Sequence, residues 1–144
     1  QFYEMALPLR RAVGDRGGEA TTLNNMGGVY SAIGEKVKAL QFFEMALPLY
    51  RAVGDRGGEA YTLHNMGLLL WEMGQQQEGM AMLEQAIALF IAVRSPNAEI
   101  GKGYLSQMKA ALGPSYRAIA RLNLRERDEQ GNYKIRWFNR KRKS

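Results

Sequence analysis

Residues 41–67 read QFFEMALPLYRAVGDRGGEAYTLHNMG, and residues 1–27 read QFYEMALPLRRAVGDRGGEATTLNNMG. Over the full period, 24 of the 40 positions of residues 1–40 recur unchanged in residues 41–80. A third copy begins at residue 81, where AMLEQAIALFIAV aligns with QFFEMALPLYRAV, and then fades. Self-similarity at a fixed period is typical of stacked-repeat proteins, in which each unit buries its apolar face against its neighbours. The repeats therefore predict a short solenoid.

Within each copy, apolar residues recur at the spacing of amphipathic helices. The spacing predicts helices over residues 1–13, 20–33, 37–53, 60–73, 77–93, 98–112 and 116–129, separated by glycine or proline turn signals. We expect an all-α chain whose array spans residues 1–112. Its parts are a half-repeat (1–19), two full repeats (20–59 and 60–97), a degenerate repeat helix (98–112), a C-terminal capping helix (113–130) and a basic, flexible tail (131–144).

The segment of residues 14–19, which recurs at residues 54–59, is rich in glycine. A glycine-rich loop before a helix can cradle a phosphate, but the spacing differs from that of a P-loop and the Lys-Ser/Thr pair is missing. We interpret Gly14 and Gly54 as helix C-caps and the aspartate that follows each as the N-cap of the next helix. Pro8 and its repeat, Pro48, fall inside predicted helices, where a proline is expected to cause a bend.

The net charge of +6 belongs to the C-terminal tail. Residues 131–144 hold six of the 20 basic residues and no acidic one, which leaves 14 basic and 14 acidic residues in the remainder. Aromatic residues interleave with these charges, so the tail could bind nucleic acid or an anionic membrane surface. We favour a solvated, flexible terminus and regard nucleic acid as an unlikely partner. The basic tail residues are Lys134, Arg136, Arg140, Lys141, Arg142 and Lys143.

Composition argues against several functional classes. The absence of cysteine excludes disulfides and thiol chemistry, and agrees with a cytoplasmic location. The single histidine, His64, has no matching cluster of metal ligands or triad partners in the sequence. No apolar run approaches the roughly 18 residues that a membrane span needs. We expect no enzyme activity, cofactor, metal or small-molecule substrate. Because residue 1 falls inside a repeat, we also expect a piece of a longer array without a leader peptide.

The hairpins resemble tetratricopeptide repeats. The family pattern combines large apolar residues that fill the space between two helices with small residues that let the helices approach. The 40-residue period exceeds the usual roughly 34 and resembles the long-repeat subclass of kinesin light chains, Leu-Gly-Asn-repeat adaptors and bacterial multi-repeat proteins. The resemblance implies a right-handed helix-turn-helix solenoid. The pattern is carried by Leu23, Met26, Gly27, Tyr30, Gly34, Ala39, Phe43 and Ala46, and by Leu63, Met66, Gly67, Leu70, Gly74, Gly79, Leu83 and Ala86.

The resemblance also implies a binding face, because partners of this family usually lie along the concave face lined by the first helix of each hairpin. Asn25 and Asn65 match an asparagine that bonds the main chain of a bound peptide in long-repeat relatives. A carboxamide is suited to this role because it offers a donor and an acceptor together. The alternative, that each asparagine ties neighbouring helices, stays open. The expected face comprises Thr21, Asn24, Asn25, Gly28, Ser31, Tyr61, His64, Asn65, Leu68, Trp71, Glu72, Tyr104, Leu105 and Met108.

The two full repeats differ mainly on this face. Small residues of the first repeat are replaced by Tyr61, Leu68 and Trp71 in the second, which predicts an apolar patch for a partner. Ile91 stands where the earlier copies have arginine, so we expect that end to be covered by the last helix, another chain or further repeats. The interpretation is a protein–protein interaction scaffold that holds a peptide or helix. The alternatives are self-assembly into a homo-oligomer through the repeat ends and nucleic-acid binding through the tail.

Overall fold

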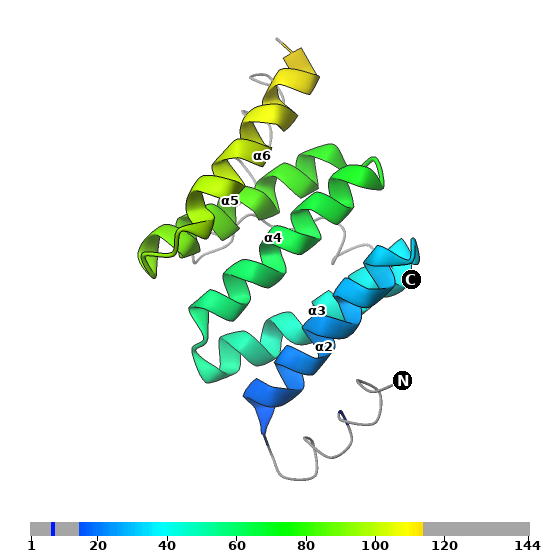
Figure 1. Ribbon diagram of the computed structural model, residues 1–144, viewed down its shortest axis with the longest axis vertical. Coiled ribbons are helices and arrows are strands. Elements are labelled where there is room, and N and C mark those ends of the chain that lie inside the picture. Colours follow the sequence, from blue (N-terminus) through cyan, green and yellow to red (C-terminus); the bar gives the residue numbers. More distant parts are fainter. Residues whose placement is uncertain (1–6, 8–14, 114–144) are drawn as a thin grey trace, which may run out of the picture.

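The computed structural model describes residue 7 and residues 15–113, which contain five helices and no strand (Figure 1). The predicted all-α fold is confirmed: the described chain is a solenoid of helical hairpins. α2 packs on α3, α4 packs on α5, and α6 packs on α5 after the second hairpin. The helices are α2 (Arg16–Ala32), α3 (Lys36–Val53), α4 (Arg56–Glu72), α5 (Gln76–Ala92) and α6 (Asn97–Leu112).

Each helix lies where the apolar spacing predicted it, but α2 and α4 begin four residues earlier than expected. The glycine-rich segments form the first turns of these helices rather than loops. Asp15 and Asp55 are the N-caps, and their side chains accept hydrogen bonds from the backbone N–H of Gly18 (2.7 Å) and Gly58 (2.8 Å). The aspartates therefore satisfy backbone donors that the first turn leaves without partners.

The end of α3 follows the sequence, and the bend expected at its internal proline stays a prediction. Gly54 ends α3 in the left-handed conformation with φ 71°, as predicted, whereas Gly14 lies outside the described residues. Pro48 lies inside α3 on its exposed side, and the helix continues through it to Val53. The proline at this position is therefore compatible with an uninterrupted helix.

One apolar core runs through both hairpins. It combines the large side chains that the repeat pattern singled out with the alanines between them. Leu7 and Phe42 extend the apolar packing around Ala20, Leu23 and Tyr50. The main core consists of Tyr30, Ala39, Leu40, Phe43, Leu47, Ala60, Leu63, Met66, Leu69, Leu70, Met82, Ala86, Phe90 and Ala98.

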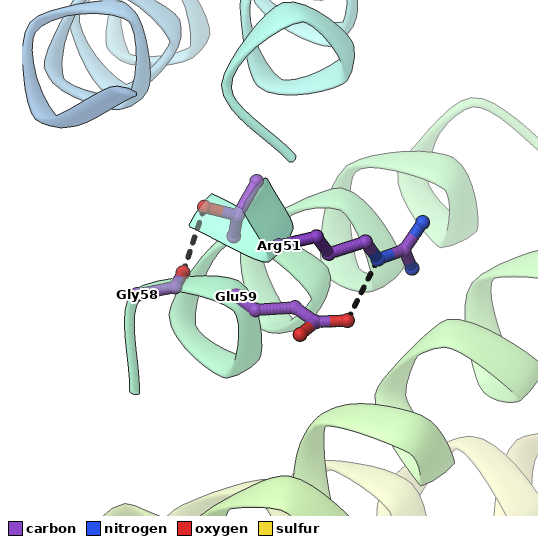
Figure 2. A network of polar contacts seen from close by, with 4 residues as sticks. Arg51, Gly58 and Glu59 are labelled. Carbon is purple, nitrogen blue, oxygen red and sulfur yellow. Dashed lines mark hydrogen bonds and ion pairs between the residues drawn. The ribbon is translucent and has the colours of Figure 1, made fainter. Parts of the chain in front are cut away.

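The junction between the two hairpins is held by contacts from the end of α3 to the first turn of α4. Arg51 Nε lies 2.7 Å from Glu59 Oε1, beside Gly58 (Figure 2). Tyr50 packs so close to Gly58 that a Cβ there would lie 2.4 Å from its ring. The next junction has Ile91 in place of Arg51, and Glu99, the counterpart of Glu59, pairs with Lys102 at 2.8 Å instead.

The outer face of α6 differs from the equivalent face of α4. In α4 this face packs on the second helix of its hairpin through Leu63, Met66 and Leu70. Forty residues later these positions are Gly103, Ser106 and Ala110, which are all exposed. α6 therefore lacks the apolar surface that receives a second helix in the preceding hairpins. The predicted capping helix at 113–130 lies outside the described residues, apart from Gly113.

Candidate partner-binding face

The first helices of the hairpins form one side of the described structure, with α4 between α2 and α6 (Figure 1). Side-chain contacts connect them. Thr62 of α4 donates a hydrogen bond to Asn24 Oδ1 of α2 at 3.0 Å, and the rings of His64 of α4 and Tyr104 of α6 meet edge to face at 5.7 Å. We call this side the first-helix face. It comprises Thr21, Asn24, Asn25 and Gly28 of α2, Tyr61, His64, Asn65 and Leu68 of α4, and Tyr104 of α6.

The asparagines of this face have different roles. Asn24 is 8% exposed and accepts the hydrogen bond from the buried Thr62, so it ties the first repeat to the second. Asn25 is exposed and Asn65 is half-buried. Within residues 15–113, neither of these two side chains makes a hydrogen bond. The role of an interhelical tie, which the sequence left open for Asn25 and Asn65, is filled by their neighbour Asn24. Thr62, its partner, was not singled out from the sequence.

Two tyrosines of the first-helix face and one ion pair at the end of α4 are exposed to solvent. Tyr61 is 49% exposed and Tyr104 is 42% exposed. Glu72, at the end of α4, lies with its Oε2 3.7 Å from Lys36 Nζ at the start of α3, and both side chains are largely exposed. An exposed pair at this distance stabilises the fold little, so both groups are accessible to a partner at low energetic cost.

Leu68 and Trp71 are only partly accessible because they pack on an apolar cluster of α5 and α6. Both side chains pack against a cluster of Met80, Leu83 and Ile87 from α5 and Met108 from α6. Leu105 and Leu112 of α6 join the same cluster. The apolar replacements in the second repeat therefore have a partner within the chain. Ile91, in contrast, is 53% exposed in the described structure.

His64 lies at the meeting point of three helices. Its ring contacts Tyr104 of α6 and Phe90 of α5, the latter at 6.2 Å between centroids. Nδ1 is buried and has no hydrogen-bond partner among the described residues. Burial lowers the pKa of this imidazole below its ordinary value of 6.5. At neutral pH the side chain is therefore an uncharged ring that packs between the repeats.

Comparison with known families decides the class of protein. The tetratricopeptide repeat family model matches residues 1–52 and 38–92. The chain belongs to the tetratricopeptide repeat family. No curated protein matches it.

As a tetratricopeptide repeat protein, the chain belongs to a family of non-catalytic scaffolds whose repeats generally mediate protein–protein interaction. Among the described residues, no group of three His, Cys, Asp or Glu side chains could hold a metal ion. None of the described helices is long and apolar enough to cross a membrane. The basic tail at 131–144 lies outside the described residues, and its role stays a prediction.

Proposed function

We propose that this tetratricopeptide repeat protein binds an extended peptide of a partner protein along the first-helix face. The proposal rests on Asn25 and Asn65, which occupy equivalent positions of successive repeats and make no hydrogen bond among the described residues. An amide group with its donor and acceptor both available can satisfy a peptide unit of any sequence. The long-period resemblance supports the same role, because asparagines at this position hold peptide main chains in such relatives.

The spacing of the two asparagines suits an extended chain. Packed helices lie about 8–10 Å apart, and an extended peptide advances about 3.3 Å per residue. Asn25 and Asn65 would therefore hold main-chain groups that are a few residues apart. Tyr61 and Tyr104 would supply the side-chain contacts, because exposed tyrosines offer apolar area and a hydrogen-bonding hydroxyl. Trp71 is a poor probe of binding, because it also belongs to the apolar cluster beneath α6.

A displayed peptide library selected on the immobilised 144-residue chain tests the proposal. Selected peptides are synthesised, and their affinities are measured for the wild type, Asn65→Ala and Tyr61→Thr, the second of which installs the residue of the first repeat. Loss of an amide that pairs with a buried peptide group costs about 1–3 kcal/mol, which is about a 5- to 150-fold loss of affinity. We expect a loss of this size for Asn65→Ala.

Met45 provides the matched control, because it is exposed on α3, a second helix of its hairpin. Met45→Ala should leave the affinity of the selected peptides unchanged. Selected peptides that bind Asn65→Ala and Tyr61→Thr as tightly as the wild type, with circular dichroism showing folded variants, would contradict the proposal.

A further inference from the structure

His64 is a titratable group that the proposed binding function does not need. Its imidazole fills the corner between α4, α5 and α6, against the rings of Phe90 and Tyr104. The backbone of α6 passes beside it at Gly101, where a Cβ would lie 3.8 Å from His64 Nδ1 and 2.8 Å from Ile87 Cγ1. α6 is therefore seated directly on this imidazole.

The surroundings of His64 favour the neutral ring. Nδ1 is buried without a hydrogen-bond partner among the described residues, so a proton there would have no acceptor. α5 faces the imidazole with the Phe90 ring, and α6 faces it with the Tyr104 ring, whose phenol is the titratable group in contact. Burial is the cause of the lowered pKa of His64.

We propose that His64 is a pH-sensitive latch for α6: the neutral imidazole seats the helix, and protonation at mildly acidic pH loosens it. His64 is half-buried, and its buried Nδ1 has no hydrogen-bond partner among the described residues. Protonation would place an N–H donor without an acceptor and part of a positive charge at this atom, which is costly. The strain falls on α6 because few of its side chains are buried. Only Ala98, Gly101 and Met108 of α6 are buried. Locally opened states are drawn from such weakly buried elements.

The direction of the pH effect follows from the lowered pKa of His64. The detached state has the ordinary pKa of about 6.5 and therefore binds the proton more readily than the seated state. Attachment of α6 is complete above about pH 6.5 and weakens as the pH falls through this value towards the pKa of the seated state. Below the pKa of the seated state, both states are protonated, so the attachment of α6 weakens no further.

The latch has a consequence that rests on the proposed binding function. Tyr104 is carried by α6 and lies on the first-helix face, so loosening α6 removes it from its place beside His64. A peptide bound along this face would lose that contact at mildly acidic pH. The latch itself does not depend on a partner, so it is tested on the free chain.

The chain has one histidine, which makes the latch directly measurable. Imidazole NMR signals of the wild type give the His64 pKa without any substitution, and we expect a value below 6.5. Amide hydrogen exchange, corrected for its intrinsic pH dependence, should show about a three- to tenfold increase in opening of residues 97–112 between about pH 7.5 and 5.5. Residues 16–53 serve as the internal reference and should stay protected.

A fluorescence experiment gives a second readout. Trp71 packs against the cluster that includes Met108 of α6, and Trp137→Phe leaves Trp71 as the single tryptophan. Its emission should shift to the red as the pH falls below about 6.5. His64→Asn, which carries the residue of the first repeat at this position, cannot titrate and should abolish the shift.

The outcomes separate the latch from the binding proposal. A wild-type His64 pKa at or above 6.5, or opening of α6 that does not change with pH, overturns the latch. If α6 opens at mildly acidic pH while selected peptides keep their affinity at pH 5.5, the latch is supported and Tyr104 is not a binding residue. If His64→Asn is poorly folded, the pKa and exchange data on the wild type still decide.

Discussion

At the scale of single residues, Gly67 and Gly79 determine how closely the second hairpin packs. A Cβ at Gly67 would lie 2.7 Å from the carbonyl oxygen of Gly79, and a Cβ at Gly79 would lie 2.6 Å from that of Gly67. In the first hairpin the equivalent residue, Gly27, faces the ring of Phe43 instead. The smaller Leu83 replaces Phe43 in the second copy, so backbone fills the space that a ring fills in the first.

Gly67→Ala should therefore destabilise the protein. The obstructing atoms belong to the backbone of α5, which cannot rotate away as a side chain can, and overpacking typically costs about 1–3 kcal/mol. Gly28→Ala is the matched control, because a Cβ at this helical glycine meets nothing within 4 Å. It should raise stability by up to about 1 kcal/mol through helix propensity. Urea unfolding of the two variants measures both effects, and equal stabilities would contradict the close approach.

At the scale of elements, the four turns between the helices share one hydrogen-bond pattern. After α3, Gly54 N–H bonds Arg51 O at 3.2 Å and Asp55 N–H bonds Tyr50 O at 3.0 Å. The other three turns repeat this pair of bonds, which satisfies carbonyl groups at the helix ends. Glycine occupies the left-handed position in the first three turns. In the last turn Arg94 adopts it, with φ 57°.

Arg94→Gly should stabilise the turn between α5 and α6. A left-handed conformation costs an L-residue with a Cβ roughly 1–2 kcal/mol, and glycine avoids this cost. Glycine also loses more conformational entropy on folding, which offsets part of the gain in stability. We expect a net gain of about 0.5–1 kcal/mol in thermal or urea unfolding. The reverse change, Gly54→Arg, should lower stability by a similar amount. A loss of stability in Arg94→Gly would show that the arginine side chain makes a compensating contact.

The sequence predicted the elements well because their signals are local. The spacing of apolar residues predicted the helices, and the residue types predicted Gly54 as a C-cap and Asp55 as an N-cap. The predicted helix starts at residues 20 and 60 were wrong, because the spacing of apolar residues begins there and Gly57 and Gly58 are poor helix formers. In α4 the Asp55 cap fixes the start of the helix, and the ring of Tyr50 packs so close to residue 58 that only glycine fits there. Such a contact joins two helices and leaves no local signal.

At the scale of the whole molecule, each repeat contacts mainly its neighbours, so the two junctions determine how the array behaves. At the second junction, Leu68 and Trp71 of α4 pack on an apolar cluster of α5 and α6. The sequence predicted an apolar patch for a partner at these residues. Their packing on α5 and α6 could not be predicted, because contacts between helices leave no local signal. Asn25, Tyr61, Glu72 and Tyr104 of the predicted site are exposed, and Asn65 is half-buried.

The junction of α2 with α4 depends on a buried polar tie. Thr62 is 0% exposed, and its single hydroxyl hydrogen is shared between Asn24 Oδ1 at 3.0 Å and the carbonyl oxygen of Gly58 at 2.9 Å. Its counterpart Thr22 is also buried and bonds the carbonyl oxygen of Gly18 at 3.0 Å. Within the described chain, Thr22 makes no equivalent bond to another helix. The two threonines therefore differ by one interaction, which links the repeats.

Thr62→Val should weaken the coupling between the hairpins. Valine keeps the shape and removes the hydroxyl, so Asn24 Oδ1 stays buried without its donor at a cost of about 1–3 kcal/mol. Thr22→Val loses only the bond within its own helix, and the difference between the two variants measures the tie. Because a solenoid is stabilised junction by junction, the loss should appear as faster hydrogen exchange in α2 and α3 than in α4 and α5. Equal losses in the two variants, or uniform exchange across both hairpins, would show that Asn24 and Thr62 do not hold the repeats together.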